Sequence, residues 1–317
     1  MVGGALALAS ALHAGCFRDG GAPQLCDGAA CGLTGGGSST GVDVTGSPPT
    51  TGGDSTTGAP VDRSITFRLD TMSFVDPHLF LSDPGDDATT GGTTGGTPGT
   101  CTNDVTTFVN QTLKGDVDDG SFSLIARFTD FGVIDEMRLF DGDCEDPVEP
   151  GGRRVCSQNP KAQAVLLTTE ALGAGGCSQL DPTRYQPINA PLIHAPQGPC
   201  VRTREFDFSV PVSDSVGSLN LRDAQFSARL DDPAAPQRLE DGVLYGFLPK
   251  AVAEDLVIDA PLFGAVNLWD TIDSPACEAM YPAYLPSIDT FEINDAKVLG
   301  VWIAINFTAE RVDYIGP

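Results

Sequence analysis

The stretch VWIAINF at residues 301–307 decides the fold class of this 317-residue chain. Every second residue in it is bulky and apolar: Val301, Ile303, Ile305 and Phe307. A period of two predicts a β-strand that turns one face into a hydrophobic core. Because the other face also carries apolar residues, Trp302 and Ala304, we expect this strand to lie near the centre of a sheet.

The same alternation recurs in the chain before this stretch. It is found at residues 64–69, 121–128 and 204–210, and at Leu219, Leu221 and Phe226, which indicate a pair of strands after a turn at Val216-Gly217. Each of these segments is predicted to be a strand with one buried face.

Helical spacing is found at two places, Val105–Leu113 after a Thr102/Asn103 cap and, more weakly, residues 251–255. The 24 Pro and 37 Gly punctuate the rest of the chain and exclude long helices. We therefore predict a mainly β fold, a single antiparallel β-sandwich-like domain with one or two short helices, stapled by disulfides.

Acidic residues dominate the charge of the chain, with 43 Asp and Glu against 18 Lys and Arg and a formal net charge of -25. Proteins that bind nucleic acids neutralise phosphates with clustered Lys and Arg. The composition therefore excludes a nucleic-acid partner. Residues 16–60 carry only four Asp and one Arg, so most of the charge belongs to the rest of the chain.

The first 15 residues carry no charged side chain and end in small residues before Cys16. About 14 apolar residues cannot cross a ~30 Å hydrocarbon core as a helix, so residues 1–15 are predicted to be a signal peptide. Ala14-Gly15-Cys16 resembles the lipobox of bacterial lipoproteins, although His13 stands where that pattern has Leu and no Lys or Arg precedes the apolar run. The resemblance implies that Cys16 is diacylated and anchors the protein in a membrane. The alternative is an ordinary cleaved signal, with Cys16 in a disulfide.

Phe17 follows Cys16 where an Asp would indicate retention in the inner membrane under the bacterial sorting rule. The resemblance therefore implies an exported protein anchored at the outer membrane or cell surface. Residues 34–60 contain 22 Gly, Ser, Thr or Pro among 27, too few apolar groups to offset the entropy of ordering. We expect a lipidated N-terminus and disordered tether at 16–60, then a β-rich globular domain at 61–317 with a disordered insert at 84–100.

The nine cysteines fit this organisation. If Cys16 carries lipid, the other eight can pair in an oxidising compartment. Short loops favour three of the bridges and leave a fourth as a long-range one: Cys26–Cys31, Cys144–Cys156, Cys177–Cys200 and Cys101–Cys277. A structural zinc site would need close CxxC-type pairs, which the sequence lacks.

Four pieces of the chain, CTNDVTTFVNQTL, DGSFSLIARF, GVLYGFL and WIAINFTAERVDY, resemble a group of predicted lipoproteins of myxobacteria and their relatives. The resemblance spans most of residues 62–317. It implies an anchored extracytoplasmic domain. Because that group has no assigned activity, the resemblance implies no catalytic residues.

Two acidic clusters have a spacing that suits calcium: Asp116, Asp118 and Asp119 before Gly120, and Asp141, Asp143, Glu145 and Asp146. Alternate carboxylates in a Gly-containing turn can converge on one Ca2+ ion, which takes six to eight oxygen ligands. Neither cluster completes an EF-hand loop. The other interpretation is that Asp-Gly and Asp-Pro form hairpin turns between strands.

No catalytic motif is found in the sequence. Neither His78 nor His194 lies in a GxSxG or HExxH context, so both are interpreted as structural or surface histidines. The glutamates are scattered, and nothing in the sequence places two of them across a cleft. The aromatic segment at 269–284 is expected to cover one end of the core, the alternative being a platform for sugars or a partner protein.

These observations favour a non-catalytic cell-surface lipoprotein with a binding or structural role. Its partners would be a membrane, through the lipid anchor, and a surface glycan or protein that the sequence does not identify. The alternative function is an extracytoplasmic hydrolase that cleaves polysaccharide or peptide with paired carboxylates. A third is a calcium-dependent adhesin, the one case that would use Ca2+.

Overall fold

The computed structural model describes most of the predicted globular domain: residues 63–82, 101–131, 136–180, 192–213, 217–260, 264–274, 277 and 288–316. All of them belong to one compact unit, Gly58–Pro317. The predicted signal peptide, the tether, the insert at 84–100 and the Cys26–Cys31 bridge lie outside the described residues.

The described residues form fifteen strands and three helices. The strands are β1 (Ile65–Asp76), β2 (Phe80–Ser82), β3 (Cys101–Asp104), β4 (Leu124–Phe128), β5 (Glu136–Glu145), β6 (Val155–Gln158), β7 (Val165–Leu172), β8 (Cys200–Thr203), β9 (Phe206–Ser213), β10 (Gly217–Leu230), β11 (Arg238–Pro249), β12 (Val257–Ala260), β13 (Gly264–Asn267), β14 (Ile288–Ile293) and β15 (Ala296–Tyr314). The helices are α1 (Thr106–Asp119), α2 (Lys250–Asp255) and α3 (Leu268–Ile272).

Eight strands pair in the ring β1–β4–β5–β7–β8–β10–β11–β15, and β15 pairs with β1 again, so this sheet is closed. All eight pairings are antiparallel. The remaining strands of the sheet attach outside the ring: β9 on β10, β14 on β15, and β6 between β5 and β15. The predicted mainly β, antiparallel, sandwich-like fold is confirmed, and the facing layers are joined at both edges.

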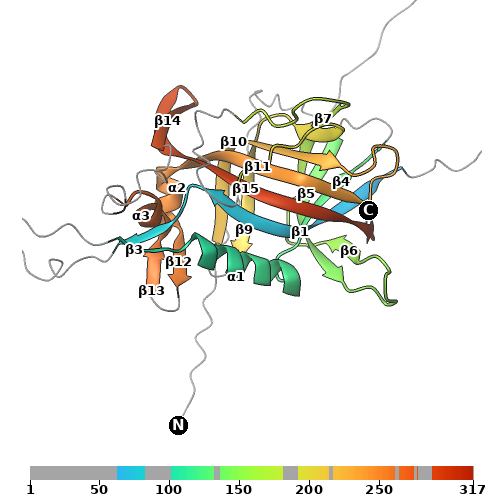
Figure 1. Cartoon of the computed structure of the whole chain (residues 1–317), viewed down its shortest axis with the longest axis horizontal. Helices are drawn as coiled ribbons and strands as arrows, with labels where there is room; N and C mark the ends of the chain where they lie inside the picture. Colours follow the sequence, from blue (N-terminus) through green and yellow to red (C-terminus); the bar gives the residue numbers. More distant parts are fainter. Residues whose placement is uncertain are drawn as a thin grey trace, which may run out of the picture. The chain divides into compact units, whose positions relative to one another are not determined.

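The strand that decided the prediction, β15, is central. It pairs with β1 on one side and with β11 on the other, and Figure 1 shows β1 and β15 side by side. Residues 301–307 are all buried. Odd-numbered side chains from Val301 to Phe307 face the inside of the ring, whereas Trp302 lies outside it and packs edge-on against Phe291 of β14.

Aromatic side chains fill the interior of the closed sheet. Phe67, Phe128, Phe226 and Phe307 are all fully buried. Phe226 stacks on Phe307 with ring centroids 4.6 Å apart, and Phe67 meets Phe128 edge-on at 5.9 Å. Gly242 makes room for this packing, because a Cβ atom there would lie 2.3 Å from the ring of Phe307. The ring of strands therefore encloses a packed core.

The helices agree with the sequence in two of three cases. The predicted α1 and α2 are confirmed, and α1 lies along β1 with Leu113 and Val117 in the core. The predicted Thr102/Asn103 cap is wrong, because both residues belong to β3 and the Asp104 side chain instead accepts from the Thr106 amide. No described helix is long and apolar enough to cross a membrane.

The third helix, α3, was not predicted. It begins after Asn267, whose side chain accepts hydrogen bonds from the amides of Trp269 and Asp270 as an N-cap does. The predicted pair of strands around Leu219–Phe226 is one continuous strand, β10. Its register shifts between Leu221 and Ala224, where Asp223 takes a φ of 51°.

Three disulfides join the cysteines of the described part, Cys101–Cys277, Cys144–Cys156 and Cys177–Cys200, as predicted. They close segments of very different length, with sequence separations of 176, 12 and 23 residues. Bridges of this kind persist in oxidising compartments and are rare in reducing ones. The domain is therefore built for an oxidising, extracytoplasmic environment.

Replacing Phe307 with Ala should lower the free energy of unfolding by about 3–5 kcal/mol, because it removes a fully buried ring from the core. Leu166→Ala, at a side chain that is 58% exposed, is the control and should change it by less than about 0.5 kcal/mol. Denaturant titration measures both values. A loss below about 1 kcal/mol for Phe307→Ala would contradict the packed interior.

Candidate functional site

A buried arginine, Arg68, is the centre of the main charged cluster. Its side chain is 2% exposed on β1 and lies directly opposite Glu310 of β15 in the strand register. Its Nε donates to the Ser123 hydroxyl at 3.1 Å, and Nη2 donates to the Val117 carbonyl near the end of α1. Burial lowers the pKa of Arg68, and the nearby charge of Arg154 lowers it further, while Glu310 opposes both effects.

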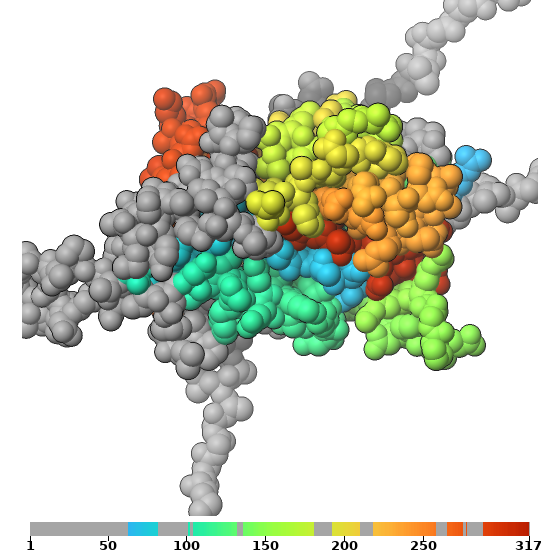
Figure 2. Space-filling model, in the orientation of Figure 1, coloured from blue at the N-terminus to red at the C-terminus, as the bar shows by residue number. Residues whose placement is uncertain are grey.

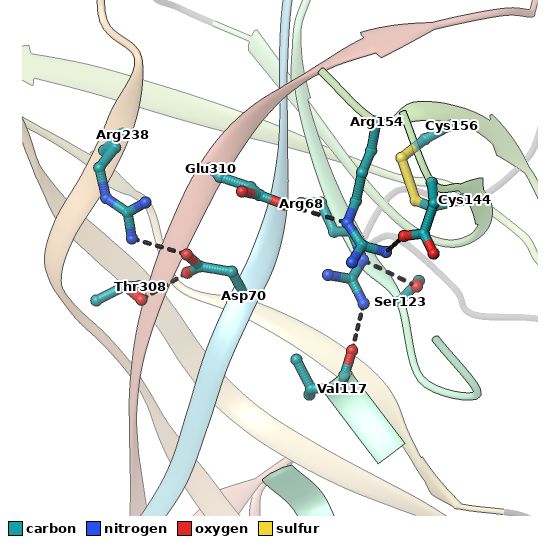
Figure 3. Close-up of polar contacts among 11 residues, drawn as sticks. Arg68, Asp70, Val117, Ser123, Cys144, Arg154, Cys156, Arg238, Thr308 and Glu310 are labelled. Carbon is teal, nitrogen blue, oxygen red and sulfur yellow. Dashed lines mark hydrogen bonds and ion pairs between the residues drawn. A yellow bond between two sulfur atoms is a disulfide. The ribbon is translucent and has the colours of Figure 1, made fainter. Parts of the chain in front are cut away.

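The cluster continues away from Arg68 toward β6. Arg154 lies 3.5 Å from a carboxylate oxygen of Glu310 and 2.9 Å from one of Asp146, as Figure 3 shows for Arg154 and Glu310. Asp146 and Arg154 both lie inside the loop that the Cys144–Cys156 bridge closes. The ion pairs therefore fix the hairpin of β5 and β6 against the outer face of β15.

A second pair sits at the bulge of β1. Asp70 falls at the register shift between Leu69 and Thr71, where it accepts from Arg238 at 2.7 Å and from the Thr308 hydroxyl at 2.5 Å. Figure 3 shows both contacts: the one to Thr308 reaches the neighbouring strand β15, and the one to Arg238 reaches β11 on the far side of β15. Each acid of this cluster therefore faces an arginine, an arrangement that stabilises strand pairing.

His78 and Asp104 form a second polar site, after β1 and at the end of β3. His78 Nδ1 lies 2.9 Å from Asp104 Oδ2, and the other carboxylate oxygen accepts from the Thr106 amide. Burial alone would raise the pKa of Asp104, but the hydrogen bonds from His78 and Thr106 outweigh it and lower that pKa. The imidazole is thus held in one orientation by an ionised carboxylate.

The other predicted structural histidine, His194, is a backbone anchor. Its Nδ1 lies 2.9 Å from the Gly242 carbonyl, and its amide donates to the Asn306 side chain at 2.8 Å. Asn306 in turn donates to the Leu192 carbonyl. These contacts hold residues 192–194 across the outer faces of β11 and β15, consistent with the structural interpretation.

The first predicted calcium cluster lies at the end of a helix. Asp116, Asp118 and Asp119 belong to the last turn of α1, and Gly120 is its left-handed C-cap with a φ of 82°. Asp118 pairs with Lys114, and Asp119 accepts from the Ser121 amide. The interpretation of this segment as a turn between strands is therefore wrong.

The second calcium cluster lies along β5. Asp141, Asp143 and Glu145 alternate on an extended strand, which places successive carboxylates about 6–7 Å apart. Asp141 accepts from the Asn159 side chain at 3.0 Å, and burial together with the charge of Asp143 raises its pKa. In the part of the chain that the structure describes, no three His, Cys, Asp or Glu side chains form a group that could hold a metal ion. Calcium binding stays a prediction.

Four of the scattered glutamates form ion pairs. Glu170 pairs with Arg202, Glu240 with Arg229, Glu254 with Lys250 and Glu310 with Arg154. Glu278 lies outside the described residues. Burial raises the pKa of two aspartates, Asp116 and Asp141, and each is further raised by a different neighbour, Asp119 and Asp143 respectively. These two aspartates lie on α1 and β5, and the hydrogen bonds of Ser121 lower the pKa of Asp119 beside the first of them.

The aromatic segment contributes to the core. Trp269 in α3 is buried with the main hydrophobic cluster, and the Lys250 ammonium lies 4.5 Å from its ring centroid. This agrees with the expectation that the segment covers one end of the core. Tyr281 and Tyr284 lie outside the described residues.

Comparison with known proteins gives no relative from which a role could be transferred. No family model, no curated protein and no solved structure matches the chain. The resemblance to myxobacterial lipoproteins therefore stays a prediction, and the geometry of the chain's own residues carries the argument about function.

Replacing Arg68 with Met should lower the free energy of unfolding by about 2–4 kcal/mol, since the Val117 carbonyl and the Ser123 hydroxyl lose their donor inside the protein. Arg138→Met, at an exposed position on β5, is the matched control and should shift it by less than about 0.5 kcal/mol. Equal effects of the two substitutions in urea titrations would show that the buried cluster does not stabilise the fold.

Asp104→Asn should destabilise the protein in a pH-dependent way. Because the pKa of Asp104 is lowered in the folded state, the stability that its carboxylate contributes is present above its ordinary pKa and is lost as pH falls through the lowered value. The difference in melting temperature between wild type and variant should therefore be largest above about pH 5 and shrink toward about pH 3. A difference that does not change with pH would argue against the His78–Asp104 interaction.

Proposed function

We propose that the chain is a lipid-anchored protein of the outer membrane or cell surface, whose closed β domain has a binding or structural role without catalysis. The membrane is its partner through Cys16, and a surface glycan or protein is its second partner. In this proposal the predicted tether at 16–60 links the anchor to the domain.

The packed interior is the observation that supports this role best. Small closed sheets that hold a ligand keep an internal cavity, whereas here four phenylalanines fill the space between the strands. A domain of this kind recognises its partner with the outside of the sheet and with its loops. Its rigid core holds those loops in fixed positions.

The distribution of charged side chains supports a role without catalysis. Two-carboxylate hydrolysis needs an acid and a base that face one cleft, with their pKa values pushed apart. The glutamates named above are instead neutralised by Arg or Lys. The Asp104 carboxylate holds His78, and the Gly242 carbonyl and the Asn306 side chain hold His194, so both histidines are fixed in place.

The disulfides support export, because they place the domain in an oxidising compartment. The anchor at Cys16 then explains the ninth cysteine. Eight cysteines are available for bridges, and three of the four expected bridges are formed in the described part of the chain.

Intact-mass spectrometry of the mature protein from an exporting bacterial host tests the anchor. The expected mature chain begins at Cys16 and carries the mass of a diacylglyceryl group, and Cys16→Ser should abolish the modification and release the protein from membranes. An unmodified N-terminus, or a peptide in which Cys16 is disulfide-bonded, would overturn the proposed anchoring.

A further inference from the structure

The hairpin that joins β5 to β6 projects from the closed sheet. We call residues 144–156 the stapled loop, because the Cys144–Cys156 disulfide closes its base. The backbone of β6 adds to the end of β15, with the amides of Asp313 and Ile315 donating to the carbonyls of Arg154 and Cys156. Figure 1 shows the hairpin at the lower right, and Figure 2 shows it as a light-green lobe that stands out from the surface.

Polar contacts within the stapled loop, and one to Gln237 outside it, fix its two arms. Arg154 pairs with Asp146 at 2.9 Å across the loop, and Arg153 donates to the Gln237 side chain at 2.5 Å. At the tip, the Gly152 amide donates to the Glu149 carbonyl at 2.9 Å, and Gly151 takes a φ of 82°. Residues 149–152 thus form a tight turn with Pro150 and Gly151 in the middle.

The most exposed large apolar side chain of the described residues is at this tip. Val148 is 100% exposed, compared with 67% for Ile315 and 66% for Leu192. Pro147 and Glu149 flank it, and Pro150 follows. A residue that precedes proline is restricted to extended backbone, so Asp146 and Glu149 are both biased toward extension on either side of Val148. The loop therefore presents a fully exposed valine on a short segment whose backbone conformation is largely fixed.

We propose that the stapled loop binds like a substrate in the cleft of a serine endopeptidase whose primary pocket is small and apolar, with Val148 in that pocket, and inhibits the enzyme. This inference rests on the proposed binding role and names its partner. Serine endopeptidases recognise a substrate chiefly by one side chain that enters the primary pocket of the enzyme. A small apolar primary pocket fits valine.

The contacts that fix the loop explain why the loop would inhibit the endopeptidase and would not be cleaved and released as a substrate. A flexible peptide loses conformational freedom when it binds, whereas a loop that is already fixed loses little, so binding is tighter. The disulfide and the Arg154–Asp146 pair hold the two arms together, and the strand addition to β15 fixes the β6 arm. Even if the bond after Val148 were hydrolysed, the two ends would stay in the cleft and product release would be slow.

The test is inhibition of pancreatic elastase by the mature full-length chain, followed with a chromogenic peptide substrate. Wild type should inhibit with about one chain per enzyme, and Val148→Asp should weaken inhibition by about 100-fold, as expected for the loss of a pocket-filling contact. Leu192→Asp is the matched control, because it makes the same change at an exposed residue outside the loop, and should inhibit like wild type.

Two further variants probe the mechanism. Val148→Arg should lose elastase inhibition and gain inhibition of trypsin, whose primary pocket carries an Asp. The Cys144→Ser/Cys156→Ser double variant should become a substrate, cut after Val148 and released. Circular dichroism of each variant checks that the domain is folded.

Failure of folded wild type to inhibit elastase overturns this inference, as does rapid cleavage after Val148 with full recovery of enzyme activity. Inhibition that survives Val148→Asp also overturns it, because another surface would then be responsible. Association of the chain with itself, seen by native mass spectrometry and lost in Val148→Asp, would assign the tip to a second copy and not to a protease. None of these results bears on Cys16, so the anchoring proposal is tested separately by its own mass measurement.

Discussion

The pairing of β1 with β15 is the constraint on which the rest of the structure depends. It joins residues about 240 positions apart in sequence and turns an open sheet into a closed one, which leaves no free edges on the eight-stranded ring. The pairing is reinforced at its bulge by the hydroxyls of Thr71 and Thr308, 2.6 Å apart. On its outer face, Arg68 connects the pairing to α1, and Glu310 connects it to the hairpin of β5 and β6 through Arg154.

Closure also determines where recognition can take place. Since phenylalanines and aliphatic side chains fill the inside of the ring, any partner must meet the outer surface or the loops. The disulfide closes the base of the stapled loop, and backbone hydrogen bonds join the loop to β15, one strand of the closing pair. A rigid core thus holds Val148 in a fixed position, which is what a substrate-like inhibitor needs.

The sequence predicted the features that depend on local pattern. The alternation around Ile303 identified a central strand, and the spacing from Val105 to Leu113 identified α1. It could not predict closure, because alternation says which face is buried and not which strand lies alongside. The prediction of a turn between strands at Asp116–Gly120 was wrong for a related reason. An Asp-Gly pair is typical of a turn, but glycine is equally common as the left-handed C-cap of a helix. Arg68 gave no local signal, since its partners come from α1, β15 and the segment before β4.

Native-state hydrogen exchange, followed by mass spectrometry, tests the role of closure most directly. Amides of β1 and of β15 between Thr66 and Phe74 and between Ile305 and Val312 should exchange together, with the same free energy as global unfolding, because opening their pairing exposes the whole core. Exchange of β1 at a clearly lower free energy, with β15, β11 and the Phe307 region still protected, would contradict the account. It would show that the first strand detaches while the rest of the domain stays folded.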